Sequence, residues 1–423
     1  MDKFVVEGPT ALNGTIEVSG SKNAALPLMA ATLLTDKPSV IRNVPQLNDI
    51  YTLNNVLRVT GTSVRFDEAA HTLHVDASTL TEAVAPYEQV RKMRASFYML
   101  GALLGRCGEA RVSLPGGCAW GPRPVNLHME GLKALGAVVE MDKGYVVAHA
   151  PGGRLKGGTF RMEPSSVGAT VNIVLGAVKA LGTSVIENAA MEPDVVYFCD
   201  ALNKMGARIS GHGTPTITIH GVDELDGMDF DNSPDRIETG TFMIAAAMHP
   251  DSDVTITNTE PADMGAFTDT FRQVGALVEV NGSTIRVKAP KHIRPVSITT
   301  EIYPGFPTDL QAQWATMMTQ AYGASEVTDT IYFDRFSYVP ELVRLGADIH
   351  LIENTVRIAG TSKLQGAAVM STDLRASVSL VMAGMVAEGT TDVLRVYHLD
   401  RGYETLEKKL NAIGARIRRE RQE

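Results

Sequence analysis

The chain has 423 residues, more than one ordinary hydrophobic core holds, so its length predicts two domains. Hydrophobic residues make up 44% and charged residues 21%, as in soluble globular proteins, and the apolar runs are too short to span a membrane. A net charge of −9 argues against a sequence-independent nucleic-acid binder, which normally presents a basic face.

The N-terminus and the cysteines favour a reduced cytoplasm. Residues 1–9 contain no basic region followed by an apolar run, so we expect no export signal. Cys107, Cys118 and Cys199 have no repeated spacing, which predicts neither a disulfide framework nor a zinc site. The histidines are scattered, without a His-Glu-x-x-His pattern, and we therefore expect no metal.

A short phrase repeats six times along the chain: an apolar residue, glycine, a small residue, then β-branched or apolar residues. Its glycines fall 75, 70, 69, 71 and 68 residues apart. Each copy follows an amphipathic segment, so the glycine sits where a helix C-cap is expected and a strand follows. The copies lie at residues 60–64, 135–139, 205–209, 274–278, 345–349 and 413–417.

A second feature repeats with the first. An apolar helix is predicted to open near each of Lys22, Arg94, Ser166, Glu238, Asp309 and Arg375. These helices, such as residues 166–175, are apolar nearly all round, which predicts burial. Six copies of one α/β unit would then form domains with helices inside and sheets outside.

Polar residues stand at the openings of these helices. They are Lys22, Arg94, Ser166, Asp235 with Glu238, Asp309, and Asp373 with Arg375. Helix N-termini carry free N–H groups and a partial positive charge, so an anion such as phosphate is a natural ligand. We therefore expect the helix openings to face a common cleft.

Residues 114–124 form a predicted loop, because glycine and proline crowd around Cys118 and Arg123. A neighbouring guanidinium lowers the pKa of a thiol and makes its sulfur reactive. The local run is equally compatible with a tight turn that contains a small apolar residue.

Nine motifs, in order along essentially the whole chain, resemble the UDP-N-acetylglucosamine enolpyruvyltransferases of bacterial peptidoglycan synthesis. They are Gly20-Ser21-Lys22-Asn23, Met93-Arg94-Ala95-Ser96, Leu114-Pro115-Gly116-Gly117-Cys118, Arg123-Pro124-Val125, Ser166-Val167-Gly168-Ala169-Thr170, Pro234-Asp235-Arg236-Ile237-Glu238-Thr239-Gly240, Phe306-Pro307-Thr308-Asp309, Thr372-Asp373-Leu374-Arg375-Ala376-Ser377 and His398-Leu399-Asp400-Arg401-Gly402-Tyr403-Glu404.

The resemblance implies an inside-out α/β barrel fold with two domains of three units each. The domains would be 1–21 with 234–423, and 22–233, the second carrying the cysteine loop at about 115–124. The implied reaction adds the sugar 3-hydroxyl to C2 of phosphoenolpyruvate and then eliminates phosphate. It needs no cofactor and no metal, and its partners are phosphoenolpyruvate and UDP-N-acetylglucosamine, with no nucleic acid and no membrane.

The resemblance also assigns four catalytic residues. Cys118 would donate a proton to phosphoenolpyruvate and can form a thioether with it, and Lys22 would hold the phosphate. Asp309 would contact the sugar 3-hydroxyl as the candidate base, and Arg401 would grip a carboxylate or phosphate. The residue types alone leave other interpretations open: a solvated lysine, a helix-capping Asp309 and a surface arginine.

Further residues are implied to contact the substrates. Ser166 to Gly168 would bind the diphosphate through backbone N–H groups, residues 123–127 would line the uridine, and Arg94 and Arg375 would support the site or form structural ion pairs. The full binding set is Lys22, Asn23, Arg94, Arg123, Pro124, Val125, Asn126, Leu127, Ser166, Val167, Gly168, Asp309, Ile331, Arg375 and Arg401.

Two departures and two rival functions accompany this resemblance. Pro164 stands where some relatives carry a lysine, and Trp120 and Pro122 replace smaller loop residues. The related enolpyruvyltransferase acting on shikimate phosphate lacks the loop cysteine and has serine in place of Asn23. Retention of Cys118, Asp309, Lys22 and Arg401 together speaks against a noncatalytic UDP-sugar sensor. An unperturbed carboxylate is a weak base at neutral pH, so Asp309 needs a raised pKa or a proton that moves late.

Overall fold

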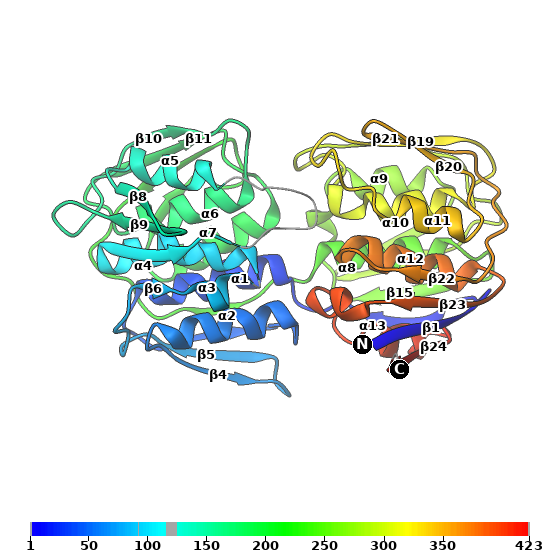
Figure 1. Cartoon of the computed structure of the whole chain (residues 1–423), viewed down its shortest axis with the longest axis horizontal. Helices are drawn as coiled ribbons and strands as arrows, with labels where there is room; N and C mark the ends of the chain where they lie inside the picture. The colour runs from blue at the N-terminus through cyan, green and yellow to red at the C-terminus, as the bar shows by residue number, and fades with distance from the viewer. Residues whose placement is uncertain (1, 92, 116–124, 422–423) are drawn as a thin grey trace. The chain divides into compact units, whose positions relative to one another are not determined.

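The computed structural model describes residues 2–91, 93–115 and 125–421, and it divides into two compact units. One unit is formed by Met1–Ser19 with Pro234–Glu423, and the other by Gly20–Ser233 (Figure 1). The sequence placed Gly20 and Ser21 with the N-terminal segment, whereas the structure places them in the second unit. Ser21 N–H donates to Ser233 O at 2.7 Å, and Asn232 Nδ2 donates to Ser21 O at 3.0 Å, which ties the start of this unit to its end.

Within the described residues each unit contains three four-stranded sheets, and all six have one strand order. The first strand runs parallel to the second, which is antiparallel to the third, which is antiparallel to the fourth. In the unit Gly20–Ser233 the sheets are β14 (Asp229–Asp231), β3 (Ser39–Arg42), β5 (Thr72–Asp76), β4 (Ser63–Asp67); β6 (Val84–Ala85), β7 (Glu109–Ser113), β9 (Tyr145–His149), β8 (Val138–Asp142); and β10 (Thr159–Arg161), β11 (Thr183–Glu187), β13 (Thr216–His220), β12 (Arg208–Ser210).

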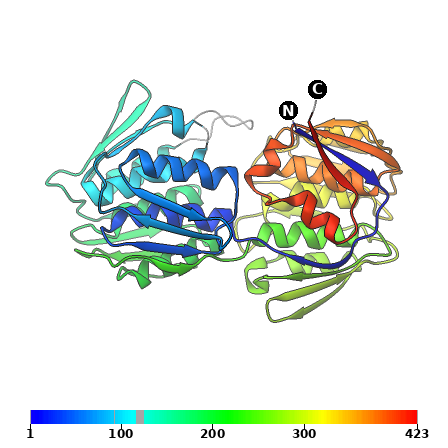
Figure 2. The same cartoon turned by 90° about the horizontal axis from the view of Figure 1, so that it is seen from below.

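The other unit repeats this order with two strands taken from the N-terminus. Its sheets are β2 (Asn13–Glu17), β15 (Asp253–Thr257), β17 (Thr284–Lys288), β16 (Leu277–Asn281); β18 (Ile298–Thr300), β19 (Ser325–Asp329), β21 (Thr355–Ile358), β20 (Ile349–Ile352); and β22 (Ala368–Met370), β23 (Gly389–Leu394), β1 (Asp2–Gly8), β24 (Ile417–Arg421). Figure 2 shows the blue strand β1 beside the red strand β24.

Three helices form the interior of each unit. They are α1 (Lys22–Ala31), α4 (Met99–Cys107) and α6 (Val167–Ala177) in one, and α8 (Arg236–Ala247), α10 (Gln311–Met318) and α12 (Leu374–Val386) in the other. In α6 every residue from 169 to 177 is buried, as expected for a helix that is apolar all round. Strands such as β9 alternate buried and less buried residues, so one face of the sheet covers the helices.

A second helix in each copy precedes the repeated glycine. These helices are α2 (Asn48–Val59), α5 (Asn126–Ala134), α7 (Pro193–Lys204), α9 (Phe267–Arg272), α11 (Val339–Arg344) and α13 (Leu406–Ala412). The glycines that follow them, Gly61, Gly136, Gly206, Gly275, Gly346 and Gly414, have φ between +88° and +111°. Glycine adopts this left-handed conformation without a Cβ clash, which ends the helix and turns the chain into the next strand.

The remaining elements are short. They are α3 (Tyr87–Val90) and the 3₁₀ turns η1 (Thr32–Leu34), η2 (Arg94–Tyr98), η3 (Pro261–Met264), η4 (Thr308–Leu310) and η5 (Val396–Arg401). The predicted α/β fold of six repeated units, with helices inside and sheets outside, is confirmed; within the described residues the sheets stay separate and form no closed barrel. No helix in this part of the chain is long and apolar enough to cross a membrane.

Candidate active site

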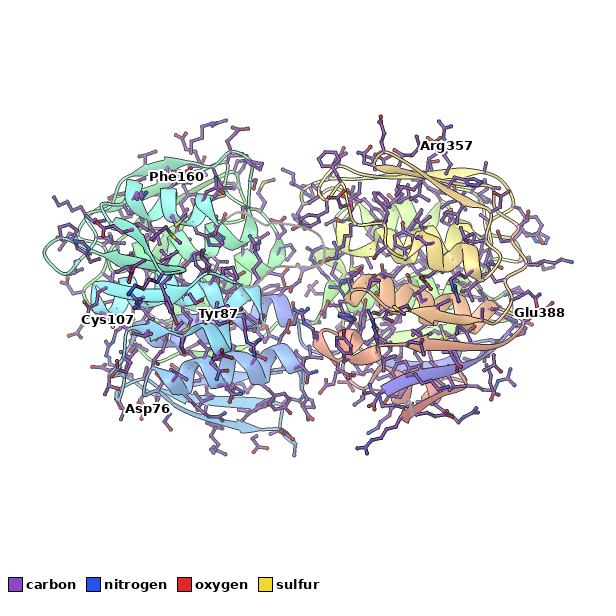
Figure 3. All side chains as sticks on the ribbon, viewed as in Figure 1. Asp76, Tyr87, Cys107, Phe160, Arg357 and Glu388 are labelled. Atoms are coloured by element: carbon purple, nitrogen blue, oxygen red, sulfur yellow. The ribbon has the colours of Figure 1, made fainter. Side chains whose placement is uncertain are left out.

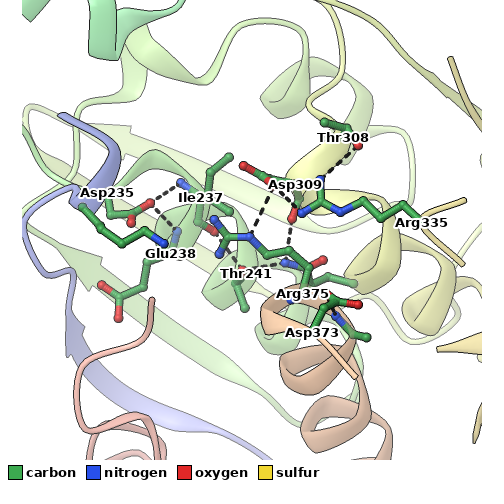
Figure 4. A network of polar contacts seen from close by, with 12 residues as sticks. Asp235, Ile237, Glu238, Thr241, Thr308, Asp309, Arg335, Asp373 and Arg375 are labelled. Atoms are coloured by element: carbon green, nitrogen blue, oxygen red, sulfur yellow. Dashed lines mark hydrogen bonds and ion pairs between the residues drawn. The ribbon is translucent and has the colours of Figure 1, made fainter. Parts of the chain in front are cut away.

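Asp309 lies in η4, directly before the buried helix α10, between two arginines (Figure 4). Its Oδ1 accepts a hydrogen bond from Arg335 Nη2 at 2.6 Å and lies 3.5 Å from Arg375 Nε. The side chains of Arg335 and Arg375 are 6% and 5% exposed, whereas that of Asp309 is 28% exposed. Two buried cations therefore hold a carboxylate that solvent still reaches.

The charge of this cluster decides the protonation state of Asp309. Burial alone would raise the pKa of its carboxyl, but Arg335 and Arg375, with a smaller contribution from Arg236, outweigh burial and hold the pKa well below its usual value. The sequence left two ways for Asp309 to act as a base: a raised pKa, or a proton that moves late in the reaction. The structure shows a lowered pKa, so it does not support the first.

Arg375 is held by a chain of hydroxyl groups. Its Nη1 donates to Tyr403 Oη at 3.0 Å, and Tyr403 Oη lies 2.9 Å from Thr241 Oγ1. Thr241 uses its own hydrogen on Ile237 O at 2.8 Å, so Tyr403 donates to Thr241 and accepts from Arg375. This order of donors directs the guanidinium of Arg375 toward Asp309.

Of the two structural alternatives for Asp309, an N-cap or a first-turn acid, the structure shows the second: Asp309 lies in the first turn of η4, which begins without a side-chain cap. Other acidic residues do cap buried helices. Asp235 Oδ1 accepts from the N–H groups of Ile237 and Glu238 at 2.8 and 3.0 Å, and Asp373 caps α12 in the same way. At α8 and α12 a side-chain carboxylate therefore already occupies the helix opening, where the backbone N–H groups favour an anion.

Arg401 is half-buried at the end of η5, which packs on α12. The following residue, Gly402, allows this approach, since a Cβ there would lie 2.4 Å from Leu374 Cδ2. Leu374 is the first residue of α12 and Arg375 the second. The fold therefore brings η5, which ends at Arg401, to the start of the helix that carries Arg375.

Lys22 is the first residue of α1 in the other unit, and its side chain is 12% exposed. Its Nζ lies 3.0 Å from Asp49 Oδ2, so Lys22 forms an ion pair rather than standing solvated. Ser21 caps α1 by accepting from Ala24 N–H at 3.2 Å and donates to Asp194 Oδ1 at 2.9 Å. Asn23 follows Lys22 and is half-buried.

Those predicted nucleotide contacts of this unit that the structure describes come together at the starts of α5 and α6. Val125 to Leu127 open α5, and Ser166 to Gly168 open α6. His128 on α5 joins them: its Nδ1 lies 2.9 Å from Asn172 Nδ2 on α6, and a Cβ at Gly168 would lie 3.2 Å from its Cε1. Burial and the charge of Arg94 lower the pKa of His128 to about 3, so its ring is neutral.

Some predicted residues lie elsewhere or outside the description. Ile331 follows β19 in the unit of Asp309, and its N–H donates to Asp329 Oδ1 at 2.9 Å. Cys118, Arg123 and Pro124 lie outside the described residues. Within residues 2–91, 93–115 and 125–421, no three His, Cys, Asp or Glu side chains are grouped so as to hold a metal ion.

The sequence reasoning missed Arg335, Tyr403 and Asp49 as partners of site residues. Nothing in the run Phe333-Asp334-Arg335 marks an arginine that reaches Asp309. Asp49 stands in the first turn of an outer helix, where an acidic residue is ordinary. Tyr403 lies in the motif of residues 398–404, but only the structure shows that its buried hydroxyl contacts Arg375 and Thr241.

The fold is that of the enolpyruvyl transferases. Residues 6–410 match the family model of EPSP synthase (3-phosphoshikimate 1-carboxyvinyltransferase). The chain is similar to the crystal structure of the enolpyruvyl transferase NikO from Streptomyces tendae, with a TM-score of 0.89 and 26% identity over 99% of this chain and 98% of that one.

Curated relatives are more similar in sequence. The chain is 52% identical to the UDP-N-acetylglucosamine 1-carboxyvinyltransferase of Chlorobaculum parvum over 99% of both proteins. It is 50% identical to that of Chloroherpeton thalassium over 99% of this chain and 97% of that one. The chain therefore belongs to the carboxyvinyltransferase family that includes the EPSP synthases and the UDP-N-acetylglucosamine 1-carboxyvinyltransferases, which confirms the resemblance in its sequence.

Proposed function

We propose that this chain transfers the enolpyruvyl group of phosphoenolpyruvate to the 3-hydroxyl of UDP-N-acetylglucosamine and releases phosphate, as a cytoplasmic step of peptidoglycan synthesis. The observation that carries this proposal is the sequence identity to the UDP-N-acetylglucosamine 1-carboxyvinyltransferases, which is 52% over 99% of the chain for the Chlorobaculum parvum protein. The Asp309 cluster supports it, because a partly exposed carboxylate held by two buried arginines can accept a hydrogen bond from an uncharged hydroxyl.

The reaction has two balanced steps. In the addition, the sugar oxygen bonds to C2 of phosphoenolpyruvate, C3 gains a proton and the hydroxyl loses one. In the elimination, the bond between C2 and the phosphate oxygen breaks and C3 gives up a proton. Cys118 is the proposed donor to C3, and Asp309 the proposed acceptor of the hydroxyl proton.

The lowered pKa of Asp309 sets the timing of that second transfer. A weakly basic carboxylate takes the hydroxyl proton only once the forming C–O bond has made it acidic. Asp309 therefore orients the hydroxyl first and accepts its proton late in the addition, which is the second alternative left by the sequence.

Lys22 is the proposed partner of an anionic substrate group. Asp49 holds its ammonium group at the start of α1, where the partial positive charge of the helix adds to that of the side chain. A phosphate next to Lys22 would be attracted by both charges, and the ion pair with Asp49 holds the ammonium in place while offsetting part of its charge.

Phosphate release from phosphoenolpyruvate, measured with each acceptor in turn, tests the proposal. We expect release with UDP-N-acetylglucosamine and none above background with shikimate 3-phosphate. The reverse pattern would assign the chain to the other branch of its family. Binding of UDP-N-acetylglucosamine by calorimetry without any phosphate release would indicate a noncatalytic sugar-nucleotide binder.

A further inference from the structure

Asp329, the last residue of β19, is fully buried and binds three separate segments. Its Oδ1 accepts from Thr300 Oγ1 at 2.7 Å and from the backbone N–H groups of Ile331 and Tyr332 at 2.9 and 3.0 Å. Its Oδ2 accepts from Thr308 Oγ1 at 2.6 Å. One carboxylate thus joins the end of β18, the turn after β19 and the residue directly before Asp309.

The Thr308 hydroxyl fixes the direction of the hydrogen bonds that lead onward. It lies 2.6 Å from Asp329 Oδ2 and 3.1 Å from Arg335 Nη1. A guanidinium only donates and a carboxylate only accepts, so the hydroxyl hydrogen goes to Asp329 and its oxygen accepts from Arg335. Arg335 Nη2 then donates to Asp309 Oδ1 at 2.6 Å.

We propose that Asp329 is a positioning residue of the transfer reaction, which directs Arg335 toward Asp309 through Thr308 and fixes Ile331 through its backbone N–H. This inference rests on the proposed function, in which Asp309 meets the sugar hydroxyl, and on the implied contact of Ile331 with UDP-N-acetylglucosamine. Because Asp329 serves both segments, its loss affects turnover and nucleotide affinity together. Loss of the Thr308 hydroxyl affects only the path to Asp309.

Two threonines provide a matched pair of variants, because each donates one hydroxyl hydrogen bond to Asp329. Thr308→Val removes the bond that continues to Arg335, and Thr300→Val removes one that does not. We expect kcat to fall about tenfold or more in Thr308→Val but at most about threefold in Thr300→Val, with comparable losses of Tm. Thr308→Ser keeps the hydroxyl and should recover most of the lost kcat.

The pH dependence of kcat separates positioning from plain stability. The charged groups that act on Asp309 are Arg335, Arg375 and Arg236. When Arg335 is released, Asp309 loses one cation that favours its ionised form, so the acid limb of kcat moves to higher pH in Thr308→Val. The limb stays at its wild-type position in Thr300→Val.

Asp329→Asn tests both segments, since its amide has only one accepting oxygen and cannot accept both from the Thr308 hydroxyl and from the N–H groups of Ile331 and Tyr332. We expect a fall in kcat together with about tenfold weaker binding of UDP-N-acetylglucosamine by calorimetry. Equal kcat losses in the two valine variants, or an Asp329→Asn protein that loses only Tm, would overturn the inference. Failure of the proposed function is seen separately, in a wild-type enzyme that uses shikimate 3-phosphate, and the valine pair can then be compared with that acceptor.

Discussion

Asp309 carries its charge between Arg335 and Arg375, and the side chains of both arginines are buried. The ion pairs lower the proton affinity of Asp309, yet its open side keeps it accessible to a substrate hydroxyl. Its use as a proton acceptor therefore depends on the acidity of the group it meets.

Asp309→Asn keeps the shape of the side chain and removes both its charge and its capacity to take a proton. We expect kcat to fall by about a hundredfold or more and the affinity for UDP-N-acetylglucosamine to change by less than about tenfold. Steady-state kinetics and calorimetry measure the two effects. Asp334→Asn, at an exposed aspartate in the same unit, is the matched control. Equal losses of kcat and affinity in Asp309→Asn would indicate a binding role instead.

The three cysteines should differ in reactivity toward an epoxide phosphonate that resembles phosphoenolpyruvate. Cys107 is exposed at the end of α4 (Figure 3), but partial burial of its thiol raises its pKa, and Cys199 is buried with its pKa raised strongly. Neither thiol is activated, so we expect label on Cys118 alone. Peptide mass mapping measures the labelled site, and Cys118→Ala should abolish labelling. Label on Cys107 would contradict this prediction.

At the scale of an element, the start of α8 contains a carboxyl group with a shifted pKa. Glu238 is buried, and its carboxylate accepts from Ser19 N–H at 2.6 Å and from Lys409 Nζ at 3.1 Å. Burial raises the pKa of Glu238 to about 7, helped by the charge of Asp235 and opposed by Lys409 and by the Ser19 N–H. Between pH 4.5 and 7 the folded protein therefore keeps a proton on Glu238 that the unfolded chain has lost.

This proton uptake predicts how stability changes with pH. Between pH 4.5 and 7 the folded state holds more protons at Glu238, so this residue lowers the free energy of unfolding as pH rises, by about 1 to 3 kcal/mol in all. Glu238→Gln removes that dependence. Urea unfolding at pH 5 and pH 8 should show the wild type losing more stability, relative to this variant, at pH 8. Glu130→Gln, at an exposed position on α5, should follow the wild type, and parallel curves for Glu238→Gln would contradict the prediction.

At the scale of the whole molecule, the N-terminal segment belongs to the unit that contains the C-terminus. Strand β1 pairs with both β23 and β24, and β2 runs parallel to β15. An interior strand supplies hydrogen bonds to two neighbours, so its removal leaves two open edges in one sheet. The unit Gly20–Ser233 has its own continuous chain and its own core.

We therefore expect the fragment 20–233 to fold alone and the fragment 234–423 to need the N-terminal segment. Circular dichroism during urea unfolding should show a cooperative transition for the first fragment. The second should show one only when a peptide of residues 1–19 is added. A cooperative transition of the fragment 234–423 without the peptide would mean that β1 and β2 are dispensable.

The sequence by itself determined the repeated architecture. The six glycines that follow amphipathic segments and the six apolar helices are local patterns, because a left-handed cap and an all-apolar surface follow from residues close together in the chain. The nine motifs likewise indicated the family and placed Asp309 and Lys22 at helix starts. The roles of Cys118 and Arg123 remain predictions from those motifs.

Only the tertiary structure decided the electrostatics of the site. Arg335 reaches Asp309 across 26 residues, Asp49 reaches Lys22 across 27, and Tyr403 reaches Arg375 across 28. No local pattern records such pairs, because charge and burial act through space between residues from different elements. The sequence could therefore name Asp309 as a candidate base, whereas the arginines packed around it determine that its pKa is lowered.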